Sequence, residues 1–255
     1  MSSSRLQAGS IMEEVQGFIV LLDISGYTRY VRAHNTRHIP FVGKSFKTTG
    51  EAHAETVVTD LLETLINATS DILKPEKLEG DAVLLTAIVD DPEQFSRLLI
   101  DRLKQVFASF HARLDELRFC QTCLCDCCSQ MSELRVKAIA HHGSFLLKTV
   151  AGFREIAGQE VIRAHRLLKN KVRSDEYLIL TEPVSILAGS ESTVQMTSHV
   201  EVDKDLGETT VWVFFPEGSE PAVATPQESY LKRLQKMRAY FAMPRDRESL
   251  LPVAK

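Results

Sequence analysis

The chain has 255 residues, of which 44% are hydrophobic and 25% are charged, and its formal net charge is −4 at pH 7. This composition is typical of a globular protein, and the small negative charge excludes a general attraction to nucleic acid or to an anionic membrane. No apolar run approaches the roughly 20 residues that span a membrane. Residues 1–15 lack the apolar core of a signal peptide, so the sequence predicts a disordered leader there and a cytoplasmic protein.

The first predicted element is a buried strand that ends at a carboxylate. Residues 18–22 are all apolar, and Asp23 follows them at once. Such a run is typical of a strand buried on both faces. A carboxylate at the rim of a core needs a cation or hydrogen-bond donors. Two interpretations of Asp23 are therefore open: a cap of the short helix predicted over 27–33, or a ligand of a cation.

Two long amphipathic helices follow, predicted over 52–73 and over 91–117 from the helical spacing of their apolar residues. Pro75 is expected to end the first. Between the helices, residues 82–89 predict a strand that the chain enters through a turn at Gly80 and Asp81. Asp81 therefore lies at the end of an apolar strand, as Asp23 does, and is interpreted either as a turn residue or as a cation ligand.

The rest of the chain predicts further strands and one more helix. The expected elements are a strand, a His-Gly turn and a returning strand over 134–150, a helix over 158–170, a strand over 176–184 and a hairpin over 199–215. The helix is expected to turn Val161, Ile162, Ala164, His165 and Leu168 towards the core. The whole predicts one α/β domain over 16–215 and a tail over 216–255 with one helix, at 228–243.

All five cysteines fall within residues 120–128, in an insert predicted over 119–129. Cys120 with Cys123 and Cys125 with Cys128 form two Cys-x-x-Cys pairs, which are typical of a structural tetrathiolate zinc site. The single residue between the pairs is shorter than the spacing of ordinary zinc sites. A site shared across a dimer, an iron–sulfur cluster and a redox-responsive thiol patch therefore remain alternatives.

Four motifs occur in an order that resembles the class III adenylate/guanylate cyclase catalytic domain over roughly 16–215. They are "FIVLLDISGYT", then "KLEGDAV" after a long helix, then the strand "LRVKAIAHHG", then "FREIAGQEVIRAHRL". The cysteine-rich insert and "AHRLLKN" are similar to a divergent bacterial branch of that family. The resemblance implies a ferredoxin-like α+β fold with an antiparallel-rich sheet flanked by helices. It also implies a head-to-tail homodimer with ATP or another purine nucleotide at its interface.

The resemblance also assigns the first two motifs to metal and phosphate. Asp23 and Asp81 would hold two Mg²⁺ or Mn²⁺ ions, with the Ile24 carbonyl as a further ligand. The ribose 3′-oxygen would attack the α-phosphate and release pyrophosphate. Backbone amides that lead into a helix attract anions, and here the amides that would bind phosphate belong to Ser25, Gly26, Tyr27 and Thr28.

In the later motifs the resemblance assigns a base-reading pair and a catalytic arginine. Lys77 and Glu155 would recognise adenine, although a solvated lysine and a surface salt bridge are the alternatives. Arg166 matches the family arginine that stabilises the transition state. Ile162, however, stands where the family has an asparagine, and isoleucine cannot donate a hydrogen bond from its side chain. Lys204 could contact a terminal phosphate or be a solvated turn residue.

Two functions therefore remain open. The first is an adenylate cyclase, a phosphorus–oxygen lyase that makes cyclic AMP from ATP. The second is a degenerate cyclase-like module that binds nucleotide and regulates without turnover, which Ile162 favours. A purely structural zinc protein would explain the cysteines but not Asp23 and Asp81. His141 and His142 are interpreted as packed side chains rather than as a site.

Overall fold

The computed structural model describes residues 12–32, 44–119 and 130–217. The cysteines, and with them the predicted zinc site, lie outside these residues, as does the helix predicted over 228–243. Residues 12–15, which the sequence placed in a leader, are instead part of the first strand and pair with the fourth. Among the described helices, none has a stretch both long and apolar enough to cross a membrane.

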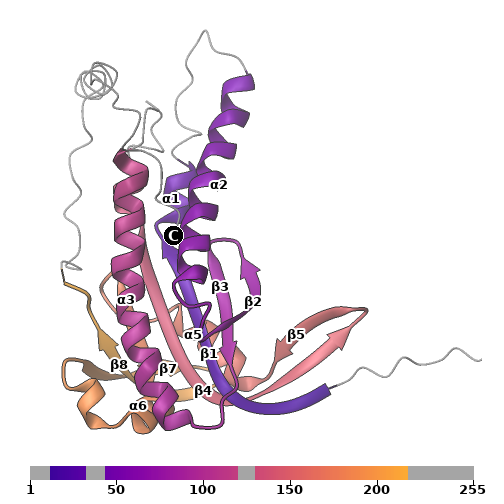
Figure 1. Ribbon diagram of the computed structural model, residues 1–255, viewed down its shortest axis with the longest axis vertical. Helices are drawn as coiled ribbons and strands as arrows, with labels where there is room; N and C mark the ends of the chain where they lie inside the picture. The colour runs from indigo at the N-terminus through magenta and orange to yellow at the C-terminus, as the bar shows by residue number, and fades with distance from the viewer. Residues whose placement is uncertain (1–11, 33–43, 120–129, 218–255) are drawn as a thin grey trace, which may run out of the picture.

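The centre of the structure is an eight-stranded sheet (Figure 1). Its order is β2-β3-β1-β4-β6-β8-β7, and β5 pairs with the far end of β4. All the described pairings are antiparallel except β4 with β6. The strands are β1 (Met12–Ser25), β2 (Lys74–Glu79), β3 (Ala82–Ala87), β4 (Arg135–Val150), β5 (Phe153–Ala157), β6 (Tyr177–Thr181), β7 (Thr197–Asp203) and β8 (Gly207–Phe214).

Helices cover both faces of this sheet, as the sequence predicted. Figure 1 shows the long helices α2 and α3 on the same side of the sheet and the β4–β5 hairpin extending away from the body. The helices are α1 (Tyr27–Arg32), α2 (Lys44–Asn67), α3 (Pro92–Phe119), α5 (Gln159–Leu167) and α6 (Glu182–Ala188), with short 3₁₀ turns η2 (Met131–Glu133) and η3 (Ser190–Thr193).

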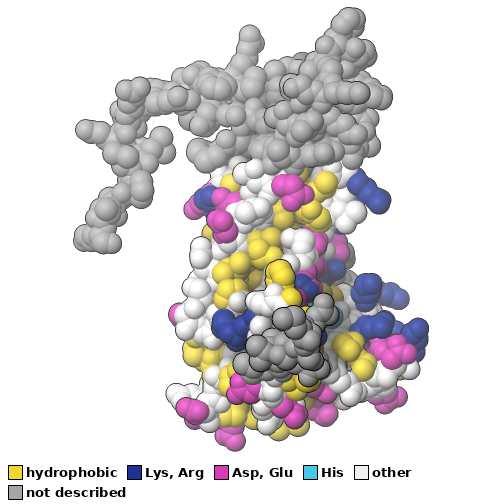
Figure 2. Space-filling view, turned by 90° about the vertical axis from the view of Figure 1, so that its right-hand side faces the viewer, with side chains coloured by type: hydrophobic (Ala, Val, Ile, Leu, Met, Phe, Trp, Pro, Cys, Tyr) yellow, Lys and Arg dark blue, Asp and Glu magenta, His cyan; other side chains and the backbone are white. Residues whose placement is uncertain are grey.

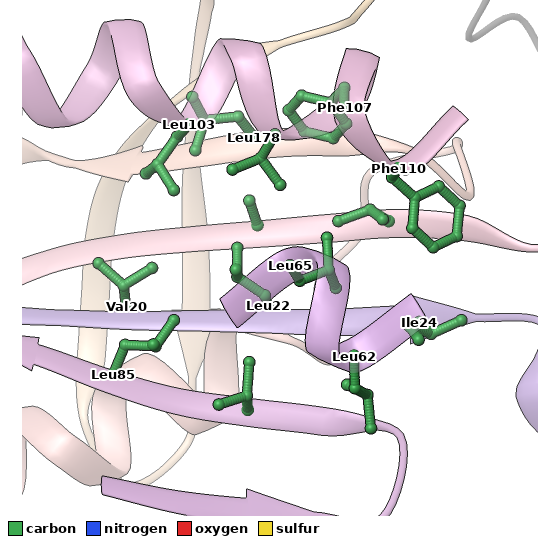
Figure 3. Close-up of a cluster of buried hydrophobic side chains, with 14 of the residues drawn as sticks. Val20, Leu22, Ile24, Leu62, Leu65, Leu85, Leu103, Phe107, Phe110 and Leu178 are labelled. Atoms are coloured by element: carbon green, nitrogen blue, oxygen red, sulfur yellow. The ribbon is translucent and has the colours of Figure 1, made fainter. Parts of the chain in front are cut away.

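Strand β1 divides the core because its side chains alternate between the two faces. Val20, Leu22 and Ile24 lie in one cluster, which contains buried residues of α2, α3 and α6 (Figure 3). Ile19 and Leu21 lie in the second cluster, on the opposite face, with buried residues of α5. Among the described helices, α5 is the one that contributes buried residues to this second cluster.

Two predicted boundaries are wrong, one because of strand pairing and the other because of local hydrogen bonds. No turn forms at His141–Gly143: β4 is continuous, and Gly143 pairs with Gly17 of β1. Helix α2 ends at Asn67 rather than near residue 73. Just beyond this end, the Thr69 hydroxyl donates to the carbonyls of Leu65 and Ile66. Such local side-chain bonds compete with the helical ladder.

Two prolines lie at positions where the lack of a backbone N–H costs little stability. Pro75 lies in the edge strand β2, where the register with β3 shifts between Pro75 and Lys77, and proline is tolerated at edges and bulges. Pro183 lies in the first turn of α6, where a missing N–H leaves no bond unmade.

A glycine-to-alanine change at Gly17 tests the close packing of the sheet centre. A Cβ atom at this position would lie 2.4 Å from the carbonyl oxygen of Ala87 on β3. Such overpacking costs about 1–3 kcal/mol, so Gly17→Ala should lower the Tm by several degrees in a thermal scan. Ser144→Ala, at an exposed position of β4 opposite Gln16, is the control and should leave the Tm unchanged. An unchanged Tm for Gly17→Ala would contradict the close approach.

Candidate nucleotide and metal site

The two carboxylates predicted to bind metal come from neighbouring ends of paired strands. Asp23 follows Ile19 and Leu21 in the same row of β1 side chains, and it lies opposite Ala82 of β3 in the register. The backbone N–H of Ile24 donates to the carbonyl of Asp81 at 2.9 Å. This bond joins the end of β1 to the turn that precedes β3, so both carboxylates lie along the same edge of the sheet, the one at which these strands begin or end.

Ionising the two carboxylates at this edge is unfavourable in the protein without a bound cation. The pKa of the Asp23 carboxyl is raised to about 6: burial is the main cause, the charge of Asp81 also raises it, and Lys137 of β4 lowers it. Burial also raises the pKa of Asp81; a backbone hydrogen bond opposes this shift and the Glu55 carboxylate adds to it. Lys137, opposite Asp23 in the register, therefore does not offset the cost of ionising these carboxylates.

The donor set fits Mg²⁺ or Mn²⁺ better than a metal held in an all-protein cage. Within the described residues, no group of three or more His, Cys, Asp or Glu side chains could hold a metal ion. Mg²⁺ keeps several waters and typically uses one or two carboxylates together with substrate phosphates. Asp23, Asp81 and the Ile24 carbonyl would be that kind of partial ligand set.

The predicted phosphate turn joins β1 to α1. Gly26 has a positive φ of 92°, and a Cβ there would lie 3.3 Å from the Glu133 carbonyl oxygen, so glycine suits the position in both respects. The hydroxyl of Tyr27 donates to Glu55 of α2 at 2.6 Å, and this bond is the main reason that its pKa is raised to about 12. The hydroxyl of Ser25 donates to Asp175 at 3.4 Å. Phosphate binding by the amides of Ser25–Thr28 stays a prediction.

The structure brings the predicted base-reading residues together. Lys77 lies on β2 and Glu155 on β5, and the Lys77 Nζ is 3.8 Å from the Glu155 Oε2. Their side chains are 48% and 39% exposed, so a ligand can reach both. The same ammonium is 3.7 Å from Glu79 Oε1. A basic donor and an acidic acceptor thus lie side by side at the surface.

Helix α5 presents Arg166 and Ile162 on its exposed side. Arg166 forms ion pairs with Asp205 at 3.5 Å and with Asp203 at 3.9 Å, on either side of Lys204 in the β7–β8 hairpin. The Ile162 side chain is 51% exposed. The prediction that Ile162 faces the core is therefore wrong, and contact of Lys204 with a phosphate stays a prediction.

His165 is another α5 residue for which the prediction of a core position is wrong. The buried residues of the helix are Val161, Ala164 and Leu167, while the partly exposed His165 donates through Nε2 to Glu79 at 3.0 Å. Periodicity places residues on a helix face but does not reveal such a partner on a distant strand. Glu79, Glu55 and Lys137 were missed for the same reason, since their roles depend on strand pairing and helix docking.

His141 is a packed residue, as the sequence suggested. Its side chain is 2% exposed, and burial lowers its pKa. Nε2 donates to Glu160 at 2.7 Å, and the Thr181 hydroxyl lies 2.8 Å from Nδ1, an arrangement that satisfies a neutral ring. Gly143 makes room for this contact, because a Cβ there would lie 2.8 Å from the Cγ of Glu160. His141 therefore fixes α5 against the sheet.

Solved structures with a similar fold are cyclases or cyclase-like. A bacterial light-regulated adenylyl cyclase matches with a TM-score of 0.57 and 14% identity, over 90% of this chain and 57% of that one. Adenylyl cyclase CyaB from Pseudomonas aeruginosa matches at 0.56 and 11%, over 82% and 99%. A class III adenylyl cyclase-like ATP-binding protein from the same organism matches at 0.53 and 13%, over 89% and 41%. These likenesses confirm the predicted cyclase-like α/β fold and, at such identities, show the fold alone.

Sequence comparisons give the family. A model described as a protein of unknown function (DUF2652) matches residues 58–177. The uncharacterized protein Rv2561/Rv2562 of Mycobacterium tuberculosis (strain ATCC 25618 / H37Rv) is 32% identical over 174 residues, which are 68% of this chain and 80% of that protein. The chain therefore belongs to the family of this mycobacterial protein and carries a DUF2652 region on a class III cyclase-like fold.

Proposed function

We propose that this protein binds ATP between two copies of the chain and converts it into cyclic AMP and pyrophosphate. The observation that carries the proposal is the contact between Lys77 and Glu155, which joins strands β2 and β5. Adenine presents an acceptor at N1 beside a donor amino group, and a lysine next to a glutamate matches both. The fold-level likeness to adenylyl cyclases and to an adenylyl cyclase-like ATP-binding protein supports this choice.

The carboxylates supply the second part of the proposal. Asp23 and Asp81 would hold divalent cations, and the excess of negative charge at this edge of the sheet favours such binding. When bound, such cations lower the pKa of an attacking hydroxyl and stabilise charge on the leaving phosphate oxygens. The chain itself would orient the triphosphate through the Ser25–Thr28 amides, and Arg166 would stabilise the charge that develops on phosphate.

A head-to-tail homodimer, which the family resemblance implies, is part of the proposal. It would place the carboxylates of one copy opposite Lys77 and Glu155 of the other. Figure 2 shows a face on which hydrophobic side chains lie exposed among charged ones, and a second copy would bind on a face of this kind.

A second candidate function is nucleotide binding without turnover, and Ile162 favours it. This exposed side chain occupies the position where the resemblance places a hydrogen-bonding asparagine, one helical turn before Arg166. Losing one donor to the transition state typically costs on the order of 10²–10³ in turnover. The protein would then signal by binding ATP rather than by making cyclic AMP.

Turnover with ATP and Mn²⁺, with the product identified by mass spectrometry, tests the proposal. The wild-type chain should form cyclic AMP and pyrophosphate, and Asp23→Ala should form none, because the variant lacks one of the two carboxylates. Glu191→Gln, an exposed change in η3, should match the wild type. Product formation by Asp23→Ala at the wild-type rate would refute the assignment of Asp23.

The substitution Ile162→Asn separates the two candidate functions. It restores a donor at an exposed position, so the fold should tolerate it, and turnover should rise by roughly tenfold or more. Calorimetric ATP binding, measured beside turnover, should change little. If both the wild type and Ile162→Asn bind ATP without forming product, binding without turnover is the function.

The raised pKa of Asp23 predicts a stability that depends on pH. The folded-state value of about 6 exceeds the ordinary 3.8, so ionisation of Asp23 destabilises the fold; this cost is absent well below pH 4 and grows as pH rises. Asp23→Asn should therefore raise the free energy of unfolding by roughly 1–3 kcal/mol at about pH 8, and by less at about pH 4.5. Denaturant titrations at both pH values measure the difference.

Metal addition supplies the matching control for this experiment. Mn²⁺ should raise the Tm of the wild type by mass action and should leave the Tm of Asp23→Asn nearly unchanged. Equal stabilisation of both proteins by Mn²⁺ would show that the ion binds elsewhere, and a stability difference that is the same at both pH values would show that Asp23 ionises without cost.

A further inference from the structure

Four acidic and basic side chains form a row that connects three elements of the described structure. His165 Nε2 on α5 is 3.0 Å from Glu79 Oε2, Glu79 Oε1 on β2 is 3.7 Å from Lys77 Nζ, and Lys77 Nζ is 3.8 Å from Glu155 Oε2 on β5. Glu79 therefore uses one oxygen for each of two nitrogen partners. The row runs from the helix that carries Arg166 to the strand that carries Glu155.

His165 is the fixed end of the row. Its Nδ1 lies 2.8 Å from the carbonyl oxygen of Val161, in the preceding turn of the same helix, and its Nε2 lies 3.0 Å from Glu79 Oε2. Because both ring nitrogens lie against a partner, the ring cannot turn without losing a contact, so His165 holds Glu79 in place.

Glu79 in turn determines how Lys77 meets Glu155. An ammonium group with a single acidic neighbour pairs with that carboxylate alone. Here Lys77 lies between two carboxylates at nearly equal distances of 3.7 and 3.8 Å. Glu79 thus balances part of the lysine charge and leaves Glu155 able to accept from another donor. The result is a separate donor and acceptor, side by side and open to a ligand.

We infer that Glu79, anchored by His165, is a positioning residue that sets the preference of the site for adenine over guanine. The inference rests on the proposed function and names the group that orients its base-reading pair. Adenine offers an acceptor at N1 and a donor at its amino group, whereas guanine offers a donor at N1 and an acceptor at O6. A lysine and a glutamate held in fixed order fit the first pattern and oppose the second.

Calorimetric binding of ATP and of GTP to the full chain, each with Mn²⁺, tests this role without requiring turnover. The wild type should bind ATP more tightly, and Glu79→Gln should lower the ratio of ATP to GTP affinity by about fivefold. The variant should fold, since the ion pair between Arg154 and Glu76, at 3.5 Å, still joins β5 to β2. Glu191→Gln, far along the chain in η3, is the charge-matched control and should keep the wild-type ratio.

A double-mutant cycle distinguishes positioning from a general change in charge. His165→Gln should lower the same ratio, and in the Glu79→Gln background it should have little further effect, because the two residues act as a unit. Additive effects of the two substitutions, or an unchanged ratio in Glu79→Gln, would overturn the positioning role while ATP binding itself stands. A wild-type chain that binds neither nucleotide would overturn the proposed function together with this inference.

Discussion

The antiparallel pairing of β1 with β4 is the constraint on which the rest of this structure depends. It runs without interruption from Met12 opposite Lys148 to Ser25 opposite Arg135. Because side chains alternate along a strand, this one register decides which residues face α2 and α3 and which face α5. It also delivers Asp23 to the edge of the sheet beside Lys137. A shift by one residue would turn Asp23 to the face that is covered by α2 and α3.

The carboxylates of Asp23 and Asp81 lower the stability of the protein. Two carboxylates lie near each other with their pKa values raised by burial, and a fold selected for stability alone would replace one of them. Perturbed acidic groups of this kind cluster at functional sites. The row of His165, Glu79, Lys77 and Glu155 is different, since acidic and basic side chains alternate along it. The carboxylates of this row have basic partners within the chain, whereas the pKa of Asp23 is raised by a neighbouring carboxylate.

Much of the fold could be predicted from the sequence, because long periodic segments decide their own structure. The apolar spacing of α2 and α3 and the runs in β1, β3 and β6 gave the correct element types. Errors arose where tertiary context decides: the histidine-glycine pair that reads as a turn lies in the middle of β4, and Ile162 and His165 face outward. Neither follows from local pattern, since the first depends on the partner strand and the second on how α5 docks.

The candidate site shows the same division. Asp23, Asp81, Lys77 and Glu155 could be named from motifs in order along the chain, and the structure brings Lys77 and Glu155 into contact. Their neighbours could not be named, because Glu79 reaches His165 only after β2 and α5 have taken their places. A motif identifies residues that contact a ligand, whereas residues that orient them are visible only in three dimensions.

Gly143 has a consequence for the height at which α5 sits above the sheet. A Cβ atom at this position would lie 2.8 Å from the Cγ of Glu160. The absence of a side chain therefore allows α5 to pack closely on β4 without a shift of Glu160. The distance of Ile162 and Arg166 from the sheet is then set by a residue that touches neither. A larger residue at this one position would press on the Glu160 side chain, so the packing of α5 on the sheet depends on a residue that has no role in the proposed site.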